Sequence, residues 1–216
     1  MKCLERQFVD ETFLSDTMRD SLVGRKGQPV YRKEIAEVER GNFTEFLKEE
    51  LRRLSRYYVI SVDDEAHLQN IRELRHATKQ FEHVLFQGEL VFGRAQKALN
   101  VYLKYLWCDG QIPIPPHCPF DNEILTKLSS ELPRNCERRW TYGDEYAYRE
   151  WVAAARTAAL RAGQSLAEWE LEAYESIQRK SRKTIRATAE FLQLSREPQG
   201  DSHGWKFNRE EIQRKL

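Results

Sequence analysis

The sequence has no excess of charge of either sign. Its 35 Lys and Arg residues are balanced by 34 Asp and Glu residues, which gives a formal net charge of +1. Such a chain has no overall field that would draw it onto nucleic acid, so binding of that kind needs a local basic patch. Long apolar runs are also missing, since no stretch approaches the roughly 20 residues of a membrane span. The start, MKCLERQFVDETF, lacks the apolar core of a signal peptide. We therefore expect a cytoplasmic protein with no membrane partner.

Cysteine is scarce, and its spacing fits no paired motif. Cys3, Cys108, Cys118 and Cys136 are scattered and form no C-x-x-C pair, which favours free thiols over a disulfide framework. Zinc held by the last three cysteines and His117 is an alternative, because thiolate and imidazole are its usual ligands. Adjacent His117 and Cys118 do not easily face one ion. We expect no metal and no cofactor.

Strand-like patterns are almost missing as well. Only RYYVISV at 56–62 has the β-branched and aromatic bias of a strand. It has no partner run, so we interpret it as an extended connector or a helix end. Elsewhere apolar residues recur at three- and four-residue steps, which predicts an all-α fold of about eight helices.

The length of 216 residues suits a single compact helical domain, 1–216. Two helical lobes around a cleft, 1–88 and 89–195, with a C-terminal tail at 196–216, are the alternative division. No internal repeat is present, which argues against a solenoid.

Glycines and capping residues predict the helix boundaries in the first half. VYRKEIAEVER reads as a helix that stops at Gly41. Asn42 and Glu45 then have the spacing of a capping box that opens the next helix. A later helix is expected to start at the aspartates of 63–64 and to end at Gly88.

Similar signals divide the second half. Asp144 precedes an alanine-rich helix that should end at Gly163. Ser165 and Glu168 form a capping box for the helix that follows. After the polar linker SREPQGDSHG, a short terminal helix is expected near 208–211.

Two short stretches carry the chemistry that the sequence offers. GRAQKALN at 93–100 opens a helix, and PFDNEIL at 119–125 follows a proline-rich loop. The first resembles the hairpin and following helix of the helix-hairpin-helix DNA glycosylases, whose usual pattern is Pro-Gly-Val-Gly-Arg-Lys-Thr-Ala-Asn. On that alignment Gly93 matches the first hairpin glycine, Lys97 the catalytic lysine and Asn100 the helix asparagine. Asp121 stands where the family has its catalytic aspartate before another helix.

The resemblance covers residues 85–128 and departs from the family pattern at several points. Ala95 replaces the second glycine, and Glu123 replaces the usual histidine. Lys97 and Asp121 are also several residues further apart than is normal for the family. The extra length falls in the proline loop, where insertions are tolerated.

The resemblance implies a DNA glycosylase that flips a damaged or modified base out of DNA and removes it. Asp121 would stabilise the positive charge that develops on the sugar, and Lys97 would attack C1′ to form a Schiff base. Free lysine has a pKa of about 10.4, so the pocket would have to favour the neutral amine.

DNA contacts are expected from Gly93, Arg94 and Gln96, because backbone amides at a helix N-terminus can hold a phosphate. His117, at the tip of the ordered proline loop, and Asn100 are expected to line the pocket.

A purely structural role for the same residues is the alternative. Lys97 and Arg94 would then be solvated residues at a helix start, and Asp121 an ordinary N-cap. The chain would be a non-catalytic helical module that binds nucleic acid or a protein partner.

IQRKSRKTIR at 177–186 adds a basic stripe that could contact phosphates, although such runs are often solvated helix faces. The DNA-binding residues expected in this stripe are Arg179, Lys180, Arg182 and Lys183.

Overall fold

The structure is a computed structural model that describes residues 2–22 and 28–177, and residues 1–177 form one compact unit. Its helices confirm the all-α fold class, and an isolated antiparallel bridge joins Tyr31 and Leu85. The elements are α1 (Lys2–Ser21), α2 (Glu37–Ser55), η1 (Arg56–Val59), α3 (Asp64–Ala77), η2 (Thr78–Phe81), α4 (Phe92–Cys108), α5 (Asn122–Lys127) and α6 (Glu145–Ala162), where η denotes a 3₁₀ helix. Residues 166–177 are also helical.

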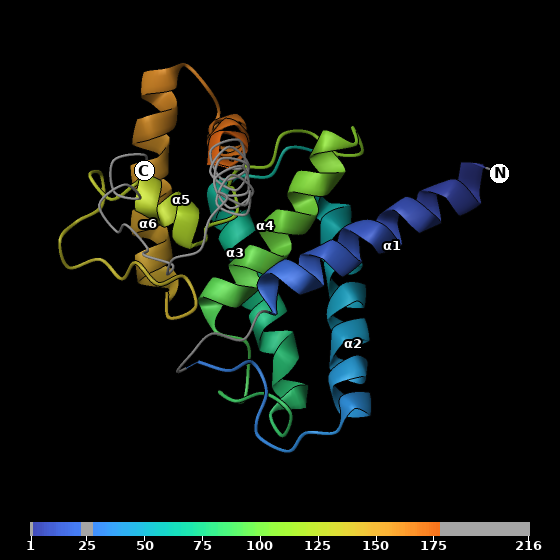
Figure 1. The fold of residues 1–216 in the computed structure, drawn as a ribbon. Coiled ribbons are helices and arrows are strands. Elements are labelled where there is room, and N and C mark those ends of the chain that lie inside the picture. The colour runs from blue at the N-terminus through green and yellow to red at the C-terminus, as the bar shows by residue number, and fades with distance from the viewer. Residues whose placement is uncertain (1, 23–27, 178–216) are drawn as a thin grey trace, which may run out of the picture. The chain divides into compact units, whose positions relative to one another are not determined.

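Helix α4 is the centre of the core. It packs against α1, α2, α3 and α6, and Figure 1 shows it among the other helices of the described unit. Every residue from Phe92 to Leu103 is buried, whichever side of the helix it faces. A surface helix buries only one stripe, so burial on all sides marks an internal helix.

Gly93 allows the first turn of α4 to lie directly against the backbone at 140–143. A Cβ built on Gly93 would stand 1.6 Å from the carbonyl oxygen of Trp140, which no side chain can occupy. The Gly93 amide donates to the carbonyl oxygen of Gly143 at 3.0 Å. This glycine is therefore required by close packing.

Most helix boundaries follow the capping signals of the sequence. Asp63 and Asp144 each accept a hydrogen bond from the backbone N–H three residues later, at 2.8 and 2.9 Å. Gly163 ends α6 in the left-handed conformation, with φ of 68°. The Ser165 amide donates to Glu168, and the Glu168 amide donates to the Ser165 hydroxyl, so this capping box is confirmed.

The helix boundary expected at Gly41 is wrong. Helix α2 begins at Glu37 and continues through Gly41 and Asn42 to Ser55. A glycine inside a helix costs only about 1 kcal/mol, and the buried face of α2 outweighs it. Residues 28–36, directly before α2, are not helical, and Glu34 there has a positive φ of 63°.

The predicted end of the next helix at Gly88 is also wrong. Helix α3 ends at Ala77, and η2 carries the chain only as far as Phe81. Gly88 has φ of 77° and lies in the turn that leads to α4. A left-handed glycine suits turns as well as helix ends, so the residue type alone did not distinguish them.

The two irregular segments expected from the sequence are confirmed. The run at 56–62 forms the short η1 and then extended backbone from Ile60. The proline-rich segment at 109–121 is a loop between α4 and α5. The basic residues of the stripe at 177–186, the polar linker and the segment expected to form the terminal helix near 208–211 lie outside the described residues.

Within the described ranges, no helix is both long enough and apolar enough to cross a bilayer.

Two helical glycines give a matched test of this packing. Gly93→Ala should lower the free energy of unfolding by several kcal/mol, because the new methyl group overlaps the Trp140 carbonyl. Gly41→Ala should raise it by about 0.5–1 kcal/mol, because the space around Gly41 is open. Urea unfolding of both variants measures the difference. Equal effects would contradict the close approach of α4 to the 140–143 backbone.

Candidate functional site

The structure brings Lys97 and Asp121 together. Lys97 projects from the first half of α4, and its Nζ lies 3.0 Å from Oδ2 of Asp121. The other carboxylate oxygen, Oδ1, accepts the amides of Glu123 and Ile124 at 2.9 and 3.0 Å, so Asp121 is also the N-cap of α5. The two side chains are 10 % and 20 % exposed. One carboxylate thus starts a helix and pairs with a lysine.

The surroundings of this pair favour the ionised carboxylate. Burial opposes ionisation of Asp121, but the charge of Lys97 and the two backbone amides together lower its pKa. The ammonium of Lys97 also lies 4.8 Å from the centre of the Trp140 ring, within cation–π distance. Lys97 is therefore held on one side by a carboxylate and on the other by an aromatic face.

Lys97 and Asp121 line a common cavity of about 230 Å³. A second lysine–carboxylate pair lines the same cavity, since Nζ of Lys104 lies 3.0 and 3.2 Å from the two oxygens of Glu170. The Glu170 side chain is only 2 % exposed. Burial raises the pKa of this carboxyl, and the nearby Lys104 ammonium offsets part of that effect. Two lysine–carboxylate pairs therefore line this cavity.

Sequence reasoning missed Lys104 and Glu170. A signal for Lys104 did exist, because Lys97, Val101, Lys104 and Cys108 follow helical spacing along one face of α4. Nothing local to Glu170 indicates that it faces the same cavity, since it comes from the helix at 166–177.

Gly93, Arg94 and Gln96, expected to contact DNA, are buried instead. Arg94 is 2 % exposed and donates to the carbonyl oxygens of Ser21 and Gln28 at 3.0 and 3.1 Å. Gln96 is fully buried, and its Nε2 donates to the carbonyl oxygens of Gly93 and Phe120. Their polar groups are bonded within the protein, so this conformation offers them no contact with DNA.

The backbone amides at the start of α4 are also occupied. The amide of Gly93 donates to Gly143, and those of Arg94 and Ala95 donate to the carbonyl oxygen of Val91. The expectation that amides around Gly93 hold a phosphate is therefore not met. The alternative that Arg94 and Lys97 are solvated residues at a helix start is also wrong, because both side chains are buried. Its N-cap at Asp121 is present.

His117 and Asn100 do not line the cavity of Lys97. Asn100 is 1 % exposed and donates to Oε1 of Gln96 at 3.2 Å and to the Tyr148 hydroxyl at 3.0 Å. His117 is 2 % exposed and lines another cavity, beside Arg156. Asn100 joins α4 to α6, and His117 joins the proline loop to α6, each through the Tyr148 hydroxyl.

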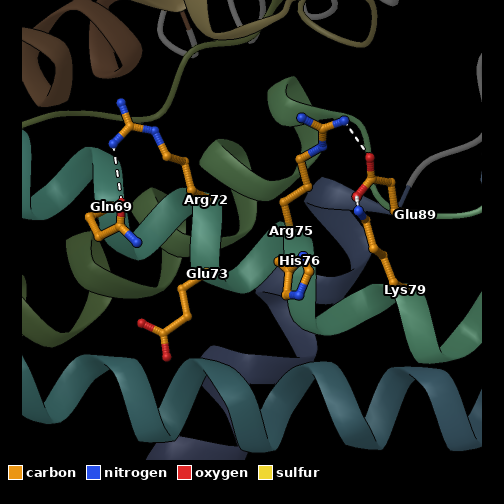
Figure 2. A pocket seen from close by; sticks show the side chains of 7 residues that line it. All are labelled: Gln69, Arg72, Glu73, Arg75, His76, Lys79 and Glu89. Carbon is orange, nitrogen blue, oxygen red and sulfur yellow. Dashed lines mark hydrogen bonds and ion pairs between the residues drawn. The ribbon is translucent and has the colours of Figure 1, made fainter.

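A further cavity, of about 500 Å³, lies along α3 and η2 (Figure 2). Arg75 pairs with Glu89, which also lies 3.9 Å from Lys79. Arg72 turns toward Gln69 within the cavity and pairs with Glu145 of α6. The cationic groups here have acidic partners, so the cavity lacks the unneutralised charge expected of a phosphate groove.

The candidate zinc ligands do not form a site. Within residues 2–22 and 28–177, no group of three or more His, Cys, Asp or Glu side chains is arranged to hold a metal ion. Cys108, Cys118 and Cys136 are free, and burial raises the pKa of the Cys118 thiol well above its usual value. The four residues of the basic stripe, Arg179, Lys180, Arg182 and Lys183, lie outside the described residues.

Comparisons with protein-family models, curated proteins and solved structures find no match to this chain.

The Lys97–Asp121 pair should contribute measurable coupling energy. Lys97→Met should lower the free energy of unfolding by about 3 kcal/mol, because it leaves a largely buried carboxylate unpaired. In an Asp121→Asn background, which keeps an N-cap, the same change should cost about 1–3 kcal/mol less. Urea unfolding of the four proteins at pH 7 gives the coupling.

The coupling also has a defined pH dependence. Because folding lowers the pKa of Asp121 from 3.8, the contribution is complete well above that pH and decreases as the solution is acidified through the folded pKa. Equal costs of Lys97→Met in both backgrounds would show that the two side chains do not interact.

Proposed function

We propose that this chain is a DNA glycosylase that removes a damaged or modified base and uses Lys97 and Asp121. One observation carries the proposal: the two residues, 24 positions apart, meet at 3.0 Å on the wall of one cavity. These are the two residues that the helix-hairpin-helix resemblance assigns to catalysis. Their approach supports that resemblance at the positions where chemistry would occur.

Asp121 is suited to stabilise positive charge. As the bond between the base and C1′ breaks, the base leaves with the bonding electrons and the sugar becomes cationic. An ionised carboxylate close to C1′ lowers the energy of that state. Its ion pair with Lys97 and its two amide contacts keep Asp121 ionised and fixed in position.

Lys97 is assigned the second step. Its amine attacks C1′ only as the neutral form, so the proton of Lys97 must leave before this step. Base release therefore depends on Asp121. Water adds to the cationic C1′ after the base has left, and the Lys97 amine then displaces that oxygen as water to form the Schiff base that permits strand cleavage.

The route by which DNA approaches differs from the family pattern. Because Gly93, Arg94 and Gln96 are buried, we assign phosphate contacts to the basic stripe at 177–186 and base entry to the cavity of Lys97. The proposal includes the cytoplasmic location expected from the sequence.

The burial of those same three residues favours a second candidate. A non-catalytic helical module would bind nucleic acid through the basic stripe, or bind a protein partner. In that case Lys97 and Asp121 would serve only to hold the proline loop against α4.

Base release tests the first candidate. Incubated with duplex DNA carrying damaged or modified bases, the protein should create abasic sites, and Asp121→Asn should reduce the rate by roughly 100-fold. Melting temperatures establish that the variant is folded. Unchanged release by Asp121→Asn, or no release by the native protein, would remove the glycosylase assignment.

Borohydride trapping tests Lys97, because reduction makes a Schiff base into a stable adduct. Lys97→Gln should not trap DNA, whereas Lys48→Gln should trap it normally. Lys48 is a matched control on α2, because its side chain is also 10 % exposed and is paired with carboxylates of Glu11 and Glu45. A Lys97→Gln protein that still forms the adduct would exclude Lys97 as the nucleophile.

The salt dependence of DNA binding tests the basic stripe, and base release measured beside it separates the two candidates. Changing Arg179 and Lys183 to Glu should weaken DNA binding broadly and make it less sensitive to salt, because fewer counterions are released. Loss of binding without any base release by the native protein would support the non-catalytic module. Binding that is unaffected by both substitutions would leave the stripe as a solvated helix face.

A further inference from the structure

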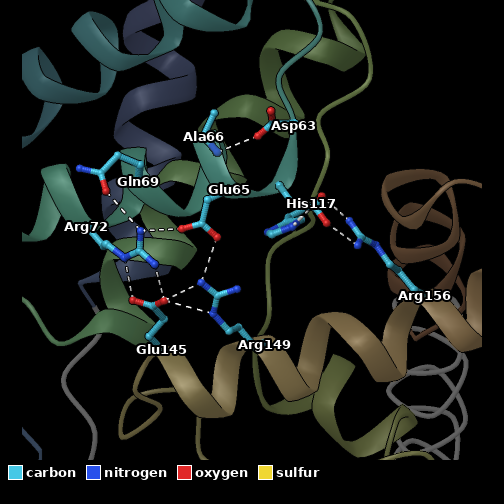
Figure 3. A network of polar contacts seen from close by, with 10 residues as sticks. Asp63, Glu65, Ala66, Gln69, Arg72, His117, Glu145, Arg149 and Arg156 are labelled. Atoms are coloured by element: carbon cyan, nitrogen blue, oxygen red, sulfur yellow. Dashed lines mark hydrogen bonds and ion pairs between the residues drawn. The ribbon is translucent and has the colours of Figure 1, made fainter.

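A cavity of about 320 Å³ lies between α3 and α6, separate from the Lys97 cavity. Its polar lining comes from Asp64, His117, Tyr148, Arg149 and Arg156, and its apolar lining from Leu68, Val152 and Ala153. Figure 3 shows His117 and the two arginines around this part of the molecule. The sequence did not suggest that these polar residues meet.

The hydrogen bonds around His117 determine which ring nitrogen carries its proton. The Tyr148 hydroxyl accepts from Nδ2 of Asn100 at 3.0 Å and lies 2.8 Å from Nδ1 of His117. Tyr148 is fully buried, so its own proton needs an acceptor, and Nδ1 is the acceptor within reach. Burial lowers the pKa of His117 to about 4, which keeps the ring neutral near pH 7. The proton of the neutral ring therefore lies on Nε2.

The Nε2–H group of His117 has no hydrogen-bond acceptor among the described residues. Oδ1 of Asp64 is near, at 3.3 Å, but the two groups do not form a hydrogen bond. Asp64 instead uses both carboxylate oxygens to bind the guanidinium of Arg156. An unsatisfied buried donor costs about 1–3 kcal/mol, so an acceptor from outside the chain would be stabilised here.

The side chains around the cavity include further donors for such an acceptor. Arg156 is paired with Asp64, and Arg149 with Glu145 and Glu65, so the two arginines offer directed N–H groups and no net positive charge. Two guanidinium groups and one imidazole N–H are donors that an oxyanion can accept.

We propose that this cavity binds a small oxyanion, a carboxylate, sulfate or phosphate group, which accepts the Nε2–H of His117 and contacts Arg149 and Arg156. Drug-sized ligands occupy pockets of roughly 300 to 1,000 Å³, so the volume suits a small molecule. A short apolar part of such a ligand packs against Leu68, Val152 and Ala153. The site does not depend on glycosylase activity.

Sulfate is a suitable probe because its charge stays constant near neutral pH. Calorimetric titration of the full chain with sodium sulfate, against sodium chloride at equal ionic strength, should give saturable binding with sulfate alone. In parallel, sulfate should shift the NMR signals of the His117 ring but leave those of exposed His83 unchanged. Loss of the shifting signals in His117→Gln assigns them. Equal responses to the two salts would overturn the proposal.

Substitutions on α6 locate the site without altering His117. Arg149→Gln should weaken sulfate binding by roughly tenfold, the effect of losing one charge-assisted hydrogen bond. Ala153→Leu should abolish it by filling the cavity from an exposed helical position. Arg161→Gln is the matched control, because Arg161 is another exposed arginine of α6 paired with a carboxylate, Glu131.

Binding by Arg161→Gln should equal that of the native protein. Should Arg149→Gln or Ala153→Leu bind sulfate as tightly as this control, the oxyanion does not occupy the cavity. Melting temperatures of all three variants establish that a loss of binding is not a loss of fold.

Discussion

The burial of α4 on all sides from Phe92 to Leu103 is the constraint on which the rest of the structure depends. Its inner half carries four polar side chains, and burial obliges each of them to find a partner inside the protein. Arg94 binds the backbone at the end of α1, and Gln96 binds Phe120 in the proline loop. Lys97 pairs with Asp121, and Asn100 reaches Tyr148 of α6. One helix thus holds segments from both ends of the described chain.

The short motif at 93–100, which suggested a function, contains residues that serve the fold and one residue that reaches a cavity. Gly93, Arg94 and Gln96 are needed where they are by close packing and by buried hydrogen bonds. Lys97 differs because it extends to the wall of a cavity and meets a carboxylate there. The proposed chemistry therefore rests on Lys97 and Asp121, and the surrounding motif is explained by the fold. A buried helix can supply a functional residue only where its face borders a cavity.

Hydrogen bonds through the core connect the walls of the two cavities. Oε1 of Gln96 accepts the amide of Phe120, which precedes Asp121, and also accepts from Asn100. Asn100 continues to the Tyr148 hydroxyl, and Tyr148 to His117 in the second cavity. The proline loop is consequently fixed at two points, Phe120 and His117. This fixation explains how a long loop presents Asp121 at a defined position opposite Lys97.

Local signals in the sequence determined the helical class, the capped helix starts at Asp63, Asp144 and Ser165, and the loop before Asp121. These features depend on backbone geometry and on hydrogen bonds within a few residues, which residue type controls directly. Tertiary structure decided the rest. Gly41 stayed helical because the apolar face of α2 is buried from Phe43 to Leu54. Arg94 became internal because it bonds to the end of α1 and lies over the Trp140 ring. Helical spacing places Lys104 on the same face of α4 as Lys97, but Glu170 meets it only after the chain has folded, because contacts between distant segments depend on packing.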